Sequence, residues 1–300
     1  MGQVTAALVK QLREQTGIGM MECKKALTEN DGNLEQAILW LRERGMSRAA
    51  KKSGRTTAEG VVKVMTSDDM KTGVVVELNS ETDFSAKNEE FQAFAEAVTK
   101  TALATKVGSV EELKAATLDG TSSNVGDALT ALIAKVGENM TLRRVSTLTA
   151  ETGIGVPYSH MGGKICTLVR LEGATGDNIV ELGKDLAMHA AAASPKYLTS
   201  TEVPEELVKQ EEDLARKKLL EEGKPADKVE MILKGQISKF FKEICLLDQG
   251  FIKEPKKSVA NFIKESGTSV ELASYVRVQL GEGIERAEDN FAAEVAAMTK

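Results

Sequence analysis

The sequence predicts an α+β protein with antiparallel sheets, and two features of its hydrophobic pattern support this fold class. Apolar residues recur with a helical period over the first part of the chain, whereas from Gly60 onward they alternate with a period of two. After that change, the order β-hairpin, helix and returning strand occurs twice. The sequence therefore predicts two related core subdomains behind a helical N-terminal segment.

Residues 1–54 are expected to form a module of three short helices followed by a basic linker. Thr5 is placed to cap the first helix and Gly17 to end it, and the second helix has Met20 on its apolar face. The third helix is expected to stop at Gly45, because glycine commonly follows a last helical turn. So small a segment buries only about 60% of its unfolded surface, so we expect it to work while attached to a larger body.

The linker between the module and the core is strongly basic, and it allows two interpretations. A segment with this density of Lys and Arg could bind phosphate groups, as an RNA- or ribosome-binding segment does. However, no aromatic residue is interleaved with these charges to stack on bases, which favours a solvated helix lying against an acidic surface of a partner or of the protein itself. The basic residues are Arg42, Arg44, Arg48, Lys51, Lys52 and Arg55.

Residues 55–150 are predicted to form the first core subdomain, with helices packed on an antiparallel sheet. The valine run at 74–76 indicates a strand that is covered on both faces. The expected elements are a hairpin of strands at 61–65 and 74–78, helices around 91–98 and 125–136, and a returning strand at 140–149.

Residues 151–280 are predicted to form the second core subdomain, with a hairpin that turns at 161–163, a helix around 179–186 and a late strand at 276–280. Along the second strand of that hairpin, one set of residues is expected to alternate inward: Ile165, Thr167, Val169 and Leu171. A helical module is expected to follow at 281–300.

The second subdomain is interrupted by a predicted antiparallel helical hairpin at about residues 202–247. Pro225 suits the start of its second helix, which carries a long apolar stripe from Val229 to Ile244. Two helices of roughly 20 residues would project about 30 Å. Packing of the stripe against its own partner helix is favoured, and a surface for self-association in a higher-order complex stays open.

Composition excludes several classes of protein. The chain has 300 residues, and 45 Asp and Glu against 39 Lys and Arg give a net charge of −6, which argues against a protein that mainly grips a polyanion. Three distant cysteines and two histidines support neither a disulfide framework nor a metal centre. No apolar run approaches the ~20 residues of a membrane span, and no signal peptide is visible, so we expect a cytoplasmic protein without cofactor or metal.

Catalytic templates also fail. The P-loop pattern is incomplete at Gly163, and the dinucleotide pattern is incomplete at Gly17, Gly153 and Gly281. The chain has no G-x-S-x-G, H-E-x-x-H or C-x-x-C sequence. The residues therefore favour a protein that acts by contact over a small-molecule enzyme.

Several local sequences together resemble the elongation factor Ts family, in the same order and over essentially the whole chain. Two of them are long and specific, namely residues 16–27 (TGIGMMECKKAL) and 81–88 (ETDFSAKN). Shorter similarities add to these at 136–139, 142–144, 281–285 and 292–295.

The resemblance implies a guanine-nucleotide exchange factor for elongation factor Tu, the GTPase that delivers aminoacyl-tRNA to the ribosome. It also implies an N-terminal module like a ubiquitin-associated (UBA) domain, a two-part α+β core, an inserted helical hairpin and a C-terminal helical module. The rival interpretations are the RNA- or ribosome-binding protein above and a ubiquitin-like adaptor that uses only the three-helix module.

The resemblance further implies that one short segment displaces Mg²⁺ from the partner: Thr82, Asp83, Phe84 and Ser85. Phe84 would enter between helices of the partner's nucleotide-binding domain, with Asp83 supplying a polar contact. From the residues alone, Phe84 lies in a loop, and its ring has the alternative of folding back onto Phe91 or Phe94. Ser85 departs from the apolar residue that is usual in the family.

The remaining contacts to elongation factor Tu also follow from the resemblance. Met20 fits the module's own core stripe as well, and a lone histidine such as His160 more often has no role. Val136 and Gly137, from the residues alone, are only the end of a helix. The implied partner-binding residues are Arg13, Met20, Met21, Lys24, Val136, Gly137 and His160.

Overall fold

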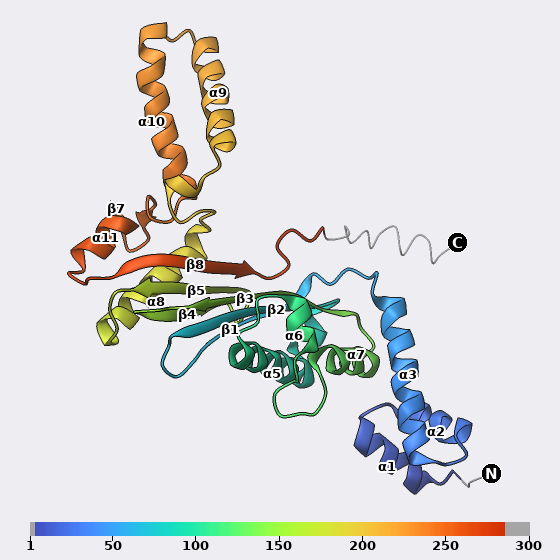
Figure 1. The fold of residues 1–300 in the computed structure, drawn as a ribbon. Coiled ribbons are helices and arrows are strands. Elements are labelled where there is room, and N and C mark those ends of the chain that lie inside the picture. Colours follow the sequence, from blue (N-terminus) through green and yellow to red (C-terminus); the bar gives the residue numbers. More distant parts are fainter. Residues whose placement is uncertain (1–3, 286–300) are drawn as a thin grey trace.

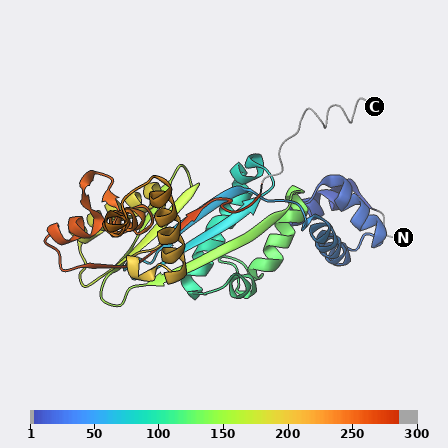
Figure 2. The ribbon, with the colours of Figure 1, turned by 90° about the horizontal axis from the view of Figure 1, so that it is seen from above.

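The computed structural model describes residues 4–285, which form an α+β fold with antiparallel sheets, as predicted. Three helices at the N-terminus lie to one side of a body of packed sheets and helices, and a helical hairpin rises from the body near its other end (Figures 1 and 2). The predicted C-terminal module falls mostly on 286–300, outside the described residues.

The N-terminal module consists of α1 (Ala6–Thr16), α2 (Met20–Glu29) and α3 (Leu34–Lys52). Thr5 caps α1 by accepting a hydrogen bond from the Leu8 backbone N–H, and Gly17 ends the helix with a left-handed φ of 64°. A small apolar core holds the three helices together, formed by Val9, Leu12, Cys23, Ala26, Leu27, Ala37 and Leu41.

The prediction that the third helix ends at Gly45 is wrong, because α3 continues through this residue to Lys52. Gly45 is buried, and a Cβ at its position would lie 3.0 Å from the Cβ of Ala134. Glycine therefore serves a close approach between α3 and a helix of the core. The tertiary contact keeps the residue helical.

Several basic side chains along α3 bind the protein's own acidic groups and carbonyls. Arg42 lies 2.5 Å from the Asp127 carboxylate, and Arg48 lies 2.8 Å from that of Glu22. Lys52 donates to the Gly137 carbonyl at the end of a core helix. This arrangement agrees with a solvated helix that lies against the protein itself.

The first sheet has the strand order β1 (Glu59–Thr66), β2 (Thr72–Ser80) and β3 (Met140–Thr149), with both pairs antiparallel. β2 is buried at every position, as its valine run predicts. The helices that follow β2 are α4 (Asp83–Lys87), α5 (Glu89–Thr105), α6 (Val110–Ala115) and α7 (Val125–Val136). Val74, Val76 and Leu78 share a core with apolar residues of α5 and α7.

The second sheet has the same topology, with the order β4 (Ile154–His160), β5 (Ile165–Glu172) and β8 (Glu271–Gln279). α8 (Asp177–Ala193) covers one of its faces. On that face lie Thr167, whose hydroxyl donates to the Ala187 carbonyl, and the buried side chains of Val169 and Leu171.

The sequence predicts that only one face of β5 is buried, but in the structure the opposite face is buried too. Cys166 and Leu168 are fully buried among Val62 and Val75 of the first sheet and Val278 of β8. The two sheets therefore pack on each other through this cluster, each with its own helices on the outer face.

A buried ionic cluster joins the sheets near the end of β8. The carboxylate of Glu77 is fully buried, lies 3.1 Å from Arg143 Nη1, and accepts hydrogen bonds from Arg144 and from the Gly281 backbone N–H at 2.8 Å. Arg144 also donates to the Gln279 carbonyl at 2.8 Å. A buried carboxylate needs such partners, so the cluster fixes the end of β8 against the first sheet.

The insertion between α8 and β8 contains a short 3₁₀ turn, η1 (Ser200–Glu202), and the two antiparallel helices, α9 (Glu205–Glu221) and α10 (Ala226–Ile244). On α10, Val229 and Leu233 are buried, whereas the later part of the apolar stripe is half-buried. The insertion ends in β6 (Gly250–Phe251), β7 (Glu254–Ser258) and α11 (Val259–Glu265).

Two helical glycines provide a test of the packing. A Cβ at Gly183 of α8 would lie 2.4 Å from Val156 Cγ2, whereas nothing lies within 4 Å of a Cβ at Gly235 of α10. We expect Gly183→Ala to lower the free energy of unfolding by about 1–3 kcal/mol through overpacking. Gly235→Ala should raise helix stability by up to about 1 kcal/mol.

Urea unfolding followed by circular dichroism measures both effects. Equal shifts of the two variants in the same direction would contradict the packing of α8 on β4.

Candidate functional site

The segment that carries Phe84 is a short helix, which corrects the expected loop. Thr82 precedes α4 and caps it, because its hydroxyl accepts a hydrogen bond from the Ser85 backbone N–H at 3.2 Å. Asp83 in the first turn has the charge that suits a helix N-terminus. A cap and an acidic first turn were thus present in the sequence, but five residues leave no apolar period to detect.

The Phe84 ring points into solvent. Its exposed fraction is 81%, whereas Phe91 is fully buried and Phe94 is 8% exposed. The alternative in which the ring folds back onto Phe91 or Phe94 is therefore wrong. Among residues 4–285, the other phenylalanines are all buried or half-buried. The Ser85 side chain is buried, so the departure from an apolar residue is accommodated inside the turn.

Asp83 lies beside the exposed ring and is paired within its own helix. Its carboxylate is 2.6 Å from Lys87 Nζ. The hydrogen bond from Lys87 holds the pKa of Asp83 below its usual value. Near neutral pH, the surface of α4 therefore presents a ring next to a charged pair.

The loop between α7 and β3 lies against the start of α4. Val136 is half-buried on the core, and Gly137 is exposed with φ 88°, the left-handed conformation that ends α7. The Glu138 carboxylate accepts a hydrogen bond from the Thr82 backbone N–H at 3.1 Å and from its hydroxyl at 2.9 Å. The structure therefore brings the Phe84 helix and Gly137 together.

Sequence reasoning missed two carboxylates at this place. Glu81 accepts a hydrogen bond from the Asn139 backbone N–H at 2.5 Å, in addition to the contact between Glu138 and Thr82. Both residues lie inside segments that carry the family resemblance. No spacing in a single sequence indicates that the two loops meet. The family segments therefore contain both glutamates, but their contacts could not be predicted from them.

The N-terminal module presents its predicted contact residues to solvent. Met20 is 48% exposed and Met21 is 76% exposed, so Met20 does not belong to the module's core. Arg13 and Lys24 are exposed as well. The module lies next to the end of α7, since a Cβ at Gly17 would come within 2.5 Å of Lys135 Nζ.

His160 ends β4 and is exposed, with Nδ1 3.1 Å from the Tyr158 hydroxyl. The turn that follows it lies against β1, because the Val62 backbone N–H donates to the Gly163 carbonyl at 2.8 Å. His160 therefore belongs to the second sheet, near the edge strand of the first, and its hydrogen-bond and ring partner among the described residues is Tyr158 rather than the Phe84 helix.

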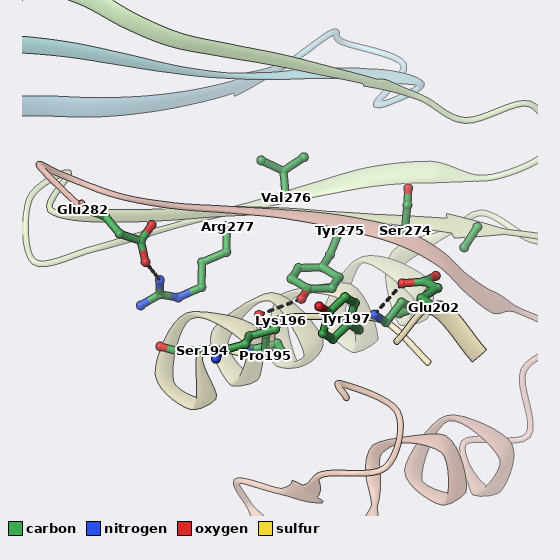
Figure 3. A pocket seen from close by; sticks show the side chains of 12 residues that line it. Ser194, Pro195, Lys196, Tyr197, Glu202, Ser274, Tyr275, Val276, Arg277 and Glu282 are labelled. Carbon is green, nitrogen blue, oxygen red and sulfur yellow. Dashed lines mark hydrogen bonds and ion pairs between the residues drawn. The ribbon is translucent and has the colours of Figure 1, made fainter. Parts of the chain in front are cut away.

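A pocket lies elsewhere on the molecule. It has a volume of about 710 Å³ and lies between β8 and the chain that follows α8 (Figure 3). Two of its polar side chains are engaged: Tyr275 donates to the Pro195 carbonyl at 2.8 Å, and Arg277 pairs with Glu282 at 3.5 Å. None of the predicted contact residues lines this cavity.

Within residues 4–285, no group of three His, Cys, Asp or Glu side chains is arranged to bind a metal ion. No helix in this part of the chain has the length and apolar character needed to cross a bilayer.

Comparison with known proteins gives one consistent result. The family model for elongation factor TS matches residues 81–282. The elongation factor Ts of Syntrophotalea carbinolica is 48% identical over 304 residues, covering 99% of this chain and all of the relative. Those of Clostridium perfringens and Rhodopseudomonas palustris are each 46% identical, covering 98% and 100% of this chain and 99% of each relative.

The exposure of Phe84 predicts that its removal leaves the fold intact. We expect Phe84→Ala to change the free energy of unfolding by no more than about 0.5 kcal/mol, as for ordinary surface substitutions. The matched change Phe91→Ala, at a fully buried ring of the neighbouring helix, should cost about 3–5 kcal/mol. Denaturant unfolding measures both, and a large loss in Phe84→Ala would show that the ring stabilises the fold.

Proposed function

Because the chain belongs to the elongation factor Ts family, we propose that it releases GDP from elongation factor Tu by placing the Phe84 ring between helices of that partner's nucleotide-binding domain. Guanine-nucleotide exchange on elongation factor Tu is the activity of the family, so the chain is an exchange factor and elongation factor Tu is its partner. Exchange makes and breaks no covalent bond, and the protein is not an enzyme in that sense.

The observation that carries the proposal is an exposed ring on a fixed base. Phe84 is 81% exposed, and α4 is held through the contact of Thr82 with Glu138. Burial of a phenylalanine side chain contributes about 1.5–3 kcal/mol, which is available here only when a partner covers the ring. That gain offsets part of the free energy needed to separate elements of the partner.

The ring would act on the part of the GTPase that holds GDP most tightly. GTPases bind the diphosphate through backbone amides at a helix N-terminus and through a Mg²⁺ ion. By linkage, the exchange factor weakens GDP binding by the same factor by which GDP weakens its own binding. We propose that Phe84 displaces the Mg²⁺-binding elements, with Asp83 as a charged contact and with Thr82 and Ser85 forming the turn.

Further contacts would hold the partner in place. Unbranched methionine side chains adapt to a facing surface, so Met20 and Met21 suit the edge of an interface, with Arg13 and Lys24 beside them. Val136 and Gly137 would meet the partner next to Phe84. We propose that His160, on the second sheet, contacts a different domain of elongation factor Tu.

The finer organisation is part of the proposal. We propose a UBA-like module with its linker at 1–54, core subdomains at 55–150 and 151–280, and a C-terminal helical module at 281–300. Each proposed core subdomain contains one three-stranded sheet with its own apolar cluster. We also propose that the protein works in the cytoplasm without a cofactor, at the site of translation.

The role of Phe84 predicts a defect in exchange. Phe84→Ala should reduce stimulated GDP release by about tenfold or more, equivalent to about 1.4 kcal/mol, because the truncated side chain no longer fills the space between the partner's helices. The measurement is release of fluorescent GDP from purified elongation factor Tu at saturating factor. An unchanged maximal rate would remove the role of the ring.

The role of the module predicts a defect in binding. Met21→Ala should raise the factor concentration that gives half-maximal release by about three- to tenfold, with the maximal rate nearly unchanged, because a contact common to all nucleotide states is lost. Leu39→Ala is the matched control, since Leu39 is 59% exposed on the same module. Identical titrations for both variants would contradict a specific contact at Met21.

A further inference from the structure

Two neighbouring loops each send a carboxylate to the backbone of the other. In the β2–α4 loop, Glu81 accepts a hydrogen bond from the Asn139 backbone N–H at 2.5 Å. In the α7–β3 loop, Glu138 accepts one from the Thr82 backbone N–H at 3.1 Å. These two reciprocal hydrogen bonds fix the distance between Glu81 and Thr82 in one loop and Glu138 and Asn139 in the other. We call these four residues (Glu81, Thr82, Glu138, Asn139) the loop clasp.

The end of α3 is joined to the same place. The Asn139 side chain is buried, and its amide donates to the Arg55 carbonyl at 2.8 Å. Arg55 in turn lies 3.4 Å from the Glu81 carboxylate, and Lys52 donates to the Gly137 carbonyl. The loop clasp therefore connects three elements: the Phe84 helix, the Gly137 turn and the helix that carries the N-terminal module.

The Thr82 hydroxyl has two functions in this arrangement. It accepts the hydrogen bond from the Ser85 backbone N–H that caps α4, and it donates to the Glu138 carboxylate at 2.9 Å. Because a hydroxyl has a single hydrogen, donation to Glu138 leaves its lone pairs free to cap the helix. Hydrogen bonds to a carboxylate are also stronger than neutral ones. Glu138 thus fixes both the position and the cap of α4.

A helix of five residues cannot hold its own conformation, since isolated helices are unstable well beyond that length. The orientation of the Phe84 ring therefore depends on what fixes the two ends of α4. Ser85 and Ala86 are the buried residues of α4, and the Ala86 carbonyl accepts a hydrogen bond from Gln92 of α5 at 2.6 Å, which holds the C-terminal end. The N-terminal end, next to Phe84, is held by the loop clasp. We propose that Glu138 is a positioning residue for nucleotide exchange, which keeps the exposed Phe84 ring at a fixed place relative to Gly137 through Thr82.

This inference rests on the proposed role of Phe84, and it concerns a residue that need not touch the partner. Glu138 is half-buried and lies outside the apolar clusters, so its loss should leave global unfolding close to that of the unchanged protein. What it should change is the freedom of α4. If Glu138 only stabilised the fold, Glu138→Ala would lower the denaturant midpoint of unfolding and would not change the mobility of the Phe84 side chain.

Exchange kinetics provide the first test, with elongation factor Tu carrying fluorescent GDP. Glu138→Ala should lower the maximal stimulated rate by about fivefold or more, with less than about threefold change in the half-saturating concentration, because positioning acts on the release step. Glu138→Gln keeps one acceptor oxygen and should recover part of the rate. Glu90→Ala is the matched control, since Glu90 pairs with Lys135 between α5 and α7 at 2.7 Å without touching the clasp.

The outcomes separate the two proposals. If Phe84→Ala reduces release while Glu138→Ala equals Glu90→Ala, the ring acts and the positioning role is wrong. If Phe84→Ala leaves release unchanged, the proposed role of the ring is wrong. A spectroscopic test on the free protein then shows whether Glu138 positions residue 84.

That second test uses a nitroxide label at position 84. The native cysteines Cys23, Cys166 and Cys245 are all fully buried, so a thiol-reactive nitroxide reacts selectively with the exposed cysteine introduced by Phe84→Cys. We expect a slow-motion spectrum in the protein with Glu138 and a clearly faster component after Glu138→Ala, with Glu90→Ala unchanged. Identical spectra with and without Glu138 would overturn the inference.

Discussion

Two antiparallel sheets pack face to face, and this packing positions every other element of the core. The middle strand of each sheet is buried on both faces, with Val75 of β2 and Leu168 of β5 inside the shared cluster. Even a Cβ at Gly73 would approach Leu168 Cδ1 to 2.6 Å. Since so little space is left, the sheets form a single body. The chain reaches the Phe84 helix directly from β2 and reaches His160 at the end of β4.

Most elements could be predicted because their signals are local. β3 has the bounds expected from its alternation, Met140–Thr149, and α7 ends at Gly137, where glycine supplies the left-handed conformation. Thr5 caps α1 as its position in the sequence suggests. Periodicity, caps and turns act over a few residues, so a single sequence is enough to find them. The roles expected for the exposed methionines and for Phe84 followed instead from the resemblance to the family.

The rest depends on which distant residues meet, and no local signal reports that. The local sequence at Gly45 predicts a helix end, whereas the residue serves a close approach to Ala134, in a helix far along the chain. The second buried face of β5 exists only because another sheet covers it. The carboxylates of Glu81 and Glu138 gain their meaning from two loops that the fold brings together. In each case the tertiary contact overrides or completes the local pattern.

The tertiary contacts of the core leave one large apolar side chain exposed beside the α7–β3 loop. The core takes up Phe91 and Phe94, while the ring of Phe84 stays outside on a turn held by charged hydrogen bonds. Single exposed apolar side chains are common on proteins, so exposure alone assigns no role. We propose a role for this ring because the chain belongs to the exchange factor family and because the ring sits on a fixed base.

Photo-crosslinking from position 84 determines whether this ring enters the nucleotide-binding domain of elongation factor Tu. A benzophenone amino acid in place of Phe84 is irradiated with elongation factor Tu, and the attached peptide is identified by mass spectrometry, with the same probe at Leu39 as control. We expect attachment to helices of the nucleotide-binding domain beside the Mg²⁺ site, and only from position 84. Attachment to another domain, or none from position 84 while the complex forms, would contradict it.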